Sequence, residues 1–164
     1  MIPFLPKKSI NFDLFKGLLL HESVKTNQLT NYGPLVRQLE QKAHKMLKLE
    51  EDFAVIATCN GTGALSAIAF AYERKARNNL SKAVQNFTFP SSAQGALSGS
   101  HKVDLTVEYQ FNSKDSLMLQ FSKLIVITNV FGHAQKFDTI FEDLADEEKI
   151  VIFDNAATPY TFVD

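Results

Sequence analysis

The chain has 164 residues, 45% of them hydrophobic and 21% charged, so it is long enough for one domain with a sizeable core, and no stretch approaches the roughly 20 apolar residues of a membrane-spanning helix. With no signal-peptide layout before Leu18-Leu19-Leu20 either, we expect a cytoplasmic protein. Its 17 basic and 18 acidic residues nearly cancel and are scattered, which argues against nucleic-acid and anionic-membrane partners and favours a small ligand. The single Cys59 excludes an internal disulfide and a cysteine zinc site, and we expect it to be a small core residue.

The N-terminal part of the chain has the weakest pattern. Residues 1–32 lack a clean hydrophobic period and predict an arm with loops and one short helix near Phe12 to His21. From Gly33-Pro34 onward, apolar residues recur at helical spacing and predict an amphipathic helix to about Leu49, with Pro34 at its first position.

The rest of the chain alternates between strand and helix patterns. An apolar strand is predicted at Phe53 to Thr58, a glycine turn at Asn60 to Gly63, and a buried helix at Ala64 to Arg77. Further elements are predicted at Ala83 to Phe89 (extended), Ser91 to Leu97 (helix), Val103 to Tyr109 (extended), Lys114 to Phe121 (helix), Leu124 to Asn129 (strand), Phe137 to Leu144 (helix) and Ile150 to Asp154 (strand). This alternation predicts a three-layer α/β/α fold with a mostly parallel sheet covered on both faces.

Asp154 closes the last apolar strand and is followed by small residues. Open α/β sheets bind their ligands at the carboxyl ends of the strands, so a carboxylate there indicates a cofactor site. The alternative is a loop acid that caps the next helix.

The turn Asn60-Gly61-Thr62-Gly63 lies where a strand pattern ends and a helix pattern begins. Free backbone N–H groups, the positive helix end, a threonine hydroxyl and the close backbone approach that glycine allows all suit a phosphate. The turn matches neither the dinucleotide-binding pattern nor a P-loop, so a purely structural turn is the alternative.

Aromatic and histidine residues give weaker indications. Phe89 precedes Pro90 at the end of an extended segment and could cover a flat ring, although a chain with 14 phenylalanines places most of them in its core. Among the histidines only His133, in a loop after a buried strand, is well placed for a site, while His44 is expected on the solvated side of its helix. No Ser/His/Asp set and no metal-ligand spacing can be assembled.

Taken in order, these motifs resemble the DegT/DnrJ/StrS family of sugar aminotransferases, which use pyridoxal phosphate. The resemblance rests on Gly33-Pro34-Leu35-Val36-Arg37-Gln38-Leu39-Glu40, Asn60-Gly61-Thr62-Gly63-Ala64-Leu65, Thr88-Phe89, Phe131-Gly132-His133 and Phe153-Asp154-Asn155-Ala156-Ala157. It implies the fold-type I aminotransferase architecture, a large α/β/α domain followed by a smaller one, and homodimers with active sites at the interface. Residues 1–32 would then be an arm, and 33–164 an incomplete cofactor-binding large domain.

The resemblance also implies roles for single residues. Thr62 and Gly63, with Gly61 shaping the turn, would bind the cofactor phosphate. Phe89 would stack on the pyridine ring, and Asp154 would bind the pyridine nitrogen and keep it protonated. Many family members have Gln or His three residues beyond this aspartate, at the ring hydroxyl. Ala157 stands there in this chain, and Thr158 follows as the candidate replacement.

The family's Schiff-base lysine lies beyond the aspartate strand, and no lysine of this chain falls in that motif. We therefore assign no catalytic residue here and expect a fragment that is inactive alone. The whole protein would be an aminotransferase that makes an amino sugar from a nucleotide-linked keto sugar with glutamate or a similar donor, for cell-surface polysaccharides or antibiotic sugars. One alternative is a dehydratase of the same family, with histidine in place of the lysine. The other is a non-catalytic α/β module that binds a phosphate ligand.

Overall fold

The computed structural model describes residues 9, 11–18, 24–28, 32–76, 81–107, 116–132 and 149–157. The chain divides into two compact units, Met1–Ala57 and Thr58–Asp164, which we describe separately. His133, Thr158 and the helix predicted at Phe137 to Leu144 lie outside the described residues. Among the described helices, none combines the length and the apolar character that a membrane span requires.

The first unit is helical. Its helices are α1 (Phe12–Leu18), α2 (Val24–Thr26) and α3 (Pro34–Met46). Helix α1 begins after Asn11, whose side-chain oxygen accepts the Leu14 N–H at 2.9 Å. Helix α3 starts at Pro34 as predicted, because proline suits a first turn in which N–H groups have no helical acceptor. It ends at Met46, three residues before the predicted end, because Lys48 takes the left-handed conformation, with φ 51°.

The strand predicted at Phe53 to Thr58 is wrong. This segment has no strand conformation, and both Phe53 and Ile56 are largely exposed. A strand needs a hydrogen-bonded neighbour, and none of the strands in the described ranges pairs with this segment. An apolar run therefore failed to give a strand for lack of a partner.

Two side chains of α3 hold the segment instead. The Glu40 carboxylate, which is buried, accepts the backbone N–H of Ala57 at 2.8 Å. His44 Nε2 lies 3.1 Å from the Glu50 carbonyl oxygen and 3.0 Å from that of Phe53. Carbonyl oxygens only accept, so Nε2 carries the hydrogen. His44 is thus half-buried and occupied with the backbone, which corrects its predicted place on a solvated face.

The second unit contains a parallel four-stranded sheet. Its strands are β1 (Lys82–Gln85), β2 (His101–Val103), β3 (Leu124–Thr128) and β4 (Ile150–Asp154), in the order β2-β1-β3-β4. Strand β3 is buried along its whole length, as its run of apolar residues predicts. The last residues of β3 and β4 are register partners, because Thr128 pairs with Asp154. The predicted strands at Leu124 and Ile150 are confirmed.

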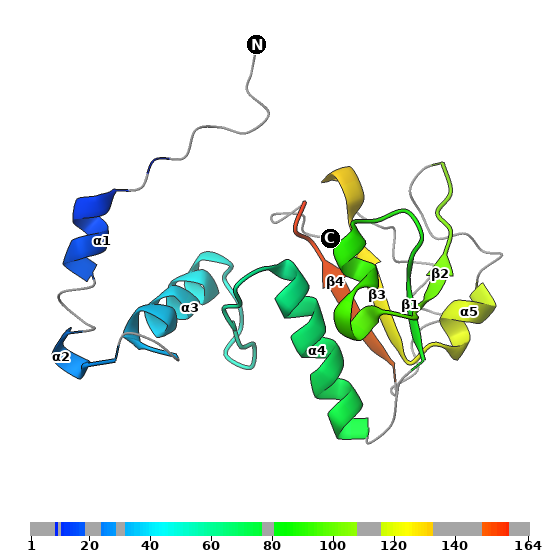
Figure 1. Cartoon of the computed structure of the whole chain (residues 1–164), viewed down its shortest axis with the longest axis horizontal. Coiled ribbons are helices and arrows are strands. Elements are labelled where there is room, and N and C mark those ends of the chain that lie inside the picture. The colour runs from blue at the N-terminus through cyan, green and yellow to red at the C-terminus, as the bar shows by residue number, and fades with distance from the viewer. Residues whose placement is uncertain are drawn as a thin grey trace, which may run out of the picture. The chain divides into compact units, whose positions relative to one another are not determined.

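Helices cover both faces of this sheet, as Figure 1 shows. On one face α4 (Gly61–Ala76) and the 3₁₀ helix η3 (Gly95–Leu97) pack on the strands, and on the other lies α5 (Ser116–Phe121). The core on the α4 face consists of Leu65, Ala69, Val84, Ala96, Leu97, Leu124, Val126 and Ile152. The core on the α5 face consists of Ala83, Val103, Leu119, Ile125 and Ile127. Alternate strand residues thus enter opposite cores, which makes the three predicted layers.

Some predicted elements of this unit differ in detail. The single helix predicted at Ser91 to Leu97 is two 3₁₀ helices, η2 (Pro90–Ala93) and η3, because Gln94 between them is extended. The extended segment predicted at Ala83 to Phe89 is shorter, because β1 ends at Gln85. The one predicted at Val103 to Tyr109 is misplaced, because β2 (His101–Val103) ends at the residue where it was expected to begin.

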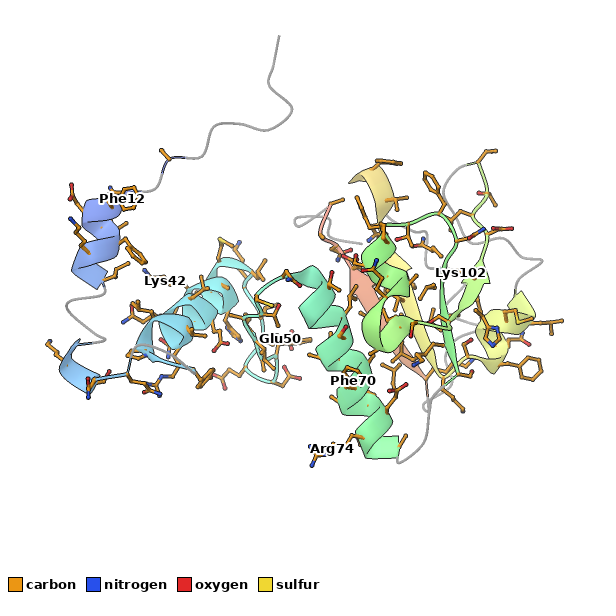
Figure 2. The ribbon with its side chains drawn as sticks, in the orientation of Figure 1. Phe12, Lys42, Glu50, Phe70, Arg74 and Lys102 are labelled. Atoms are coloured by element: carbon orange, nitrogen blue, oxygen red, sulfur yellow. The ribbon has the colours of Figure 1, made fainter. Side chains whose placement is uncertain are left out.

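Two burial predictions were wrong. Helix α4 buries only Leu65 and Ala69, and Phe70 on the opposite side is 58% exposed. Arg74, one turn further along, points away from the sheet (Figure 2). Cys59 is exposed rather than in the core, because it precedes α4 and lies outside both core clusters.

Candidate functional site

Helix α4 runs antiparallel to the strands. Its Glu73, near the C-terminal end, forms a 2.6 Å ion pair with Lys82, the first residue of β1, and both side chains are mostly buried. A helix of 16 residues spans about 24 Å, more than the roughly 17 Å of a five-residue strand. The N-terminus of α4 therefore lies at the carboxyl ends of the strands, as Figure 1 shows.

Asn60 caps the start of α4. Its side-chain oxygen accepts the Gly63 N–H at 2.8 Å, its carbonyl accepts the Ala64 N–H at 3.0 Å, and the Thr58 hydroxyl donates to the same carbonyl at 3.0 Å. Within the described part of the chain, no acceptor is recorded for the N–H groups of Gly61 and Thr62. These two donors stand at the positive end of the helix, where an anion is stabilised.

The two glycines of the motif have different surroundings. A Cβ on Gly61 would meet no atom within 4 Å, so this position opens to free space. A Cβ on Gly63 would lie 3.3 Å from the Cys59 sulfur and 3.4 Å from the Asn60 side-chain oxygen. Gly61 is the first residue of the helix rather than part of a preceding turn. Because residue 61 has no side chain, a ligand group such as a phosphate can approach the backbone there.

Phe89 stands immediately before η2, and its ring is half exposed. It lines a pocket of about 150 Å³ together with Phe87, Thr88, Val130 and Phe131. The rings of Phe87 and Phe131 are 5.9 Å apart between centroids, and Phe131 has a left-handed backbone, with φ 52°. A non-glycine residue there is uncommon, and such strain is often found at functional sites. Phe89 therefore presents an aromatic surface instead of filling a core.

Asp154 is the last residue of β4 and is half-buried. Its side chain shares the face of Ile152, the face that α4 covers, because alternate residues of a strand point the same way. One carboxylate oxygen accepts the Ala156 N–H at 3.1 Å, and the backbone carbonyl accepts the Asn129 N–H at 3.1 Å. Among the described residues no partner is recorded for the other carboxylate oxygen.

Several buried polar residues lie at this edge, and Gln85, Thr128 and Asn129 among them were not singled out in the sequence. Gln85, Ser92, Thr128 and Asn129 are all at most 2% exposed. Gln85 Oε1 accepts the Thr128 N–H at 2.7 Å, whereas Gln85 Nε2 is buried without a partner in the described part of the molecule. Ser92 Oγ lies 3.3 Å from Thr88 Oγ1 and 3.4 Å from Thr128 Oγ1. The sequence did contain a signal for such residues, because each apolar strand ends in a polar residue: β1 at Gln85, β3 at Thr128 and β4 at Asp154.

The predicted residues Gly61 to Gly63, Phe89 and Asp154 thus come from three separate segments and stand at the same edge of one sheet. No group of three or more potential metal ligands occurs in the described ranges.

A comparison with known protein families matches residues 16–161 to the model of the DegT/DnrJ/EryC1/StrS aminotransferase family. The chain belongs to this family. The match covers all the motifs on which the sequence resemblance rests.

Three solved structures share the fold. A variant of ColD has a TM-score of 0.70 and 16% identity, over 96% of this chain and 43% of that one. The GDP-4-keto-6-deoxy-D-mannose-3-dehydratase of E. coli, with bound hydrated pyridoxal phosphate, has the same TM-score and identity over 99% of this chain and 43% of its own. An aminotransferase from Psychrobacter cryohalolentis has a TM-score of 0.63 and 19% identity, over 98% and 40%. The predicted α/β fold class is confirmed, and the chain spans less than half the length of these proteins.

Proposed function

We propose that this chain supplies part of the pyridoxal phosphate site of an enzyme that acts on a nucleotide-linked keto sugar. The observation that carries the proposal is the convergence at one sheet edge of the helix N-terminus at Gly61, the exposed ring of Phe89 and the carboxylate of Asp154. The family match supports the choice of cofactor.

The start of α4 would hold the phosphate. The N–H groups of Gly61 and Thr62 are available there, Thr62 adds a hydroxyl, and the open space at Gly61 admits the group. Charge-assisted hydrogen bonds of this kind are about twice as strong as neutral ones. The Asn60 cap is already bonded to Gly63 and would keep the helix end in place.

Phe89 and Asp154 would hold the pyridine ring. Pyridoxal phosphate, when bound, supplies an electron sink for the carbon that loses a proton or group. The Asp154 carboxylate, with one oxygen already bonded to Ala156, would keep the pyridine nitrogen protonated with the other. Phe89 would cover a ring face and exclude water from it. Thr158 remains the candidate for the ring hydroxyl.

The reaction belongs to the whole protein. We propose amino transfer to the keto sugar from an amino-acid donor, in a cytoplasmic homodimer, with residues 33–164 as part of its cofactor-binding large domain and residues 1–32 as an arm. The second candidate is deoxygenation by a dehydratase, favoured by the similarity to the E. coli dehydratase. Incubation of the whole protein with a nucleotide-linked keto sugar and glutamate distinguishes them, since only the first yields an amino sugar and the second yields a deoxy sugar without the amino group.

The proposal is tested by titration of pyridoxal phosphate into the whole protein and three variants, and by assay of their turnover. Thr62→Ala should weaken binding by about 1 to 3 kcal/mol, because a hydrogen bond to a charged group is lost. Asp154→Ala should abolish turnover while the protein stays folded. Asp52→Ala, which removes an exposed carboxylate in the first unit, is the matched control and should change neither. Full turnover by Asp154→Ala would refute the assignment.

A further inference from the structure

We propose that Gln85, Ser92 and Thr128 form a clamp that sets the position of the Phe89 ring relative to the Asp154 carboxylate. The clamp residues are positioning residues, and their targets are the two groups proposed above to hold the cofactor ring. The inference therefore rests on the proposed function.

The two ring-holding groups come from segments that no main-chain ladder joins at this point. Phe89 follows β1, whose ladder with β3 ends at Val84 paired with Val126. Asp154 ends β4, which continues to pair with β3 as far as Thr128. Beyond Val84 the segment that carries Phe89 pairs only with β2, through Gln85 and the Asn86 N–H that donates to the Val103 carbonyl at 2.8 Å, so its link to β3 and Asp154 depends on side chains.

Thr128 receives those side chains on both sides of the sheet. Gln85 shares the α5 face with Ala83, and its Oε1 accepts the Thr128 N–H at 2.7 Å, in place of a main-chain acceptor. Ser92 reaches the hydroxyl of Thr128 at 3.4 Å and that of Thr88 at 3.3 Å. Gln85 and Ser92 are fully buried, so water does not compete for these groups.

Ser92 is also tied directly to Phe89. Its backbone N–H donates to the Phe89 carbonyl at 3.1 Å, which closes the first turn of η2. A continuous path of polar contacts therefore runs from the Phe89 carbonyl through Ser92 to the Thr128 hydroxyl, and Thr128 is the register partner of Asp154.

The test compares Ser92→Ala with a matched variant, Ser122→Ala. Ser122 is equally buried, but its hydroxyl donates to the Met118 carbonyl at 2.7 Å at the opposite end of β3. Two quantities are measured in the whole protein: the Kd for pyridoxal phosphate and the circular dichroism that the protein induces in the bound cofactor at saturation. The second quantity depends on how firmly the ring is fixed.

We expect Ser92→Ala to raise the Kd at least fivefold and to reduce the induced signal, and Ser92→Thr, which retains the hydroxyl, to restore most of both. Ser122→Ala should leave both unchanged even where it lowers the unfolding midpoint. Wild-type Kd and signal in Ser92→Ala would overturn the clamp and leave the proposed function standing. Failure of the wild-type protein to bind the cofactor would overturn the proposed function and the clamp with it.

A measurement without ligand tests the other contact of the clamp, the hydrogen bond from the Thr128 N–H to Gln85. Gln85→Met retains the length of the side chain but removes the acceptor for the Thr128 N–H. Hydrogen exchange at Thr128 should then accelerate at least tenfold, while exchange at Val126, inside the sheet, stays slow. Unchanged exchange at Thr128 would show that Gln85 does not hold the end of β3 and would overturn its part in the clamp.

Discussion

Gln85 holds the end of β3 with one side-chain atom and leaves another without a partner. Its orientation is fixed, because the Thr128 N–H requires an acceptor and therefore selects Oε1. The amide nitrogen is then buried with no recorded partner among the described residues, which costs about 1 to 3 kcal/mol of desolvation. At the proposed cofactor site, Gln85 therefore fixes the position of Thr128 at a cost in stability.

This environment predicts the effect of Gln85→Met on stability. The variant relieves the unpaired nitrogen but leaves the Thr128 N–H buried and unpaired, so the two changes oppose each other and the free energy of unfolding should change by less than about 1 kcal/mol. Urea unfolding measures it, with Gln94→Met, on an exposed side chain, as the control. A loss of about 3 kcal/mol or more would mean that Nε2 has a partner.

Lys48 gives a second prediction at this scale, where a residue ends a helix. It has φ 51°, a conformation that glycine adopts without strain. Lys48→Gly should therefore stabilise the helical unit by about 0.5 to 1 kcal/mol. Lys45→Gly, three residues earlier inside α3, should destabilise it by about 1 kcal/mol. Thermal unfolding compares the two, and a loss of stability in both would contradict the left-handed assignment.

At the scale of elements, the contact between η3 and α4 depends on Gly95. This residue has φ 57°, and a Cβ there would lie 2.8 Å from the Ser66 hydroxyl oxygen of α4. Gly95→Ala should therefore cost stability through both backbone strain and a clash, about 2 to 3 kcal/mol in total. Gly99→Ala is the matched control, since Gly99 has φ 76° but nothing within 4 Å. It should lose only about 1 kcal/mol, and equal losses would show that the clash is relieved by movement of Ser66.

Elements with a strong local pattern could be predicted from the sequence. Strand β3 is apolar throughout and β4 nearly so, and α3 has a clear period with proline at its start, so each was predicted within a few residues. The segment from Phe53 to Thr58 has an equally apolar pattern, but it pairs with none of the strands in the described part of the chain. Pairing is a non-local property, and a single segment does not reveal it. The break between η2 and η3, at the extended residue Gln94, likewise has no signal in the local pattern.

The candidate site was predicted to a similar extent and for the same reason. Gly61, Phe89 and Asp154 could be singled out because each stands where an apolar or helical pattern changes. Gln85 and Thr128 were not, because what relates them is a hydrogen bond between residues 43 positions apart. Their polarity was visible in the sequence, but their contact depends on the pairing of β1 with β3.

At the scale of the whole molecule, the exposed segment from Phe53 to Asn60 contains the boundary between the two units. Exposed backbone without secondary structure is the preferred substrate of proteases. Limited proteolysis of the 164-residue chain should therefore cut first between residues 53 and 60 and release the second unit intact, as mass spectrometry would show. A first cut within β3 would contradict this order.

Helix α4 also exposes large apolar side chains, among them Ile68 and Phe70. Such surface commonly lies against another protein surface. The chain spans 43% of the length of two similar proteins. We predict that copies of the 164-residue chain associate through this apolar side of α4, so that Phe70→Asp increases the monomer fraction. Sedimentation velocity tests this, with Arg74→Asp, which exchanges one charged side chain for another on the same helix, as the control. Equal monomer fractions would exclude Phe70 from the contact.

The position of Cys59 allows ligand binding at the start of α4 to be followed by the rate at which this thiol is labelled. It is the only thiol of the chain, it is exposed, and its sulfur lies beside Gly63 at the start of α4. Alkylation by a small maleimide will therefore label a single known atom without any engineering. Because that atom lies beside Gly63 in the first turn of α4, occupancy of the helix end by an anion should slow the labelling. Intact-mass kinetics could then rank phosphate-bearing compounds that have no colour.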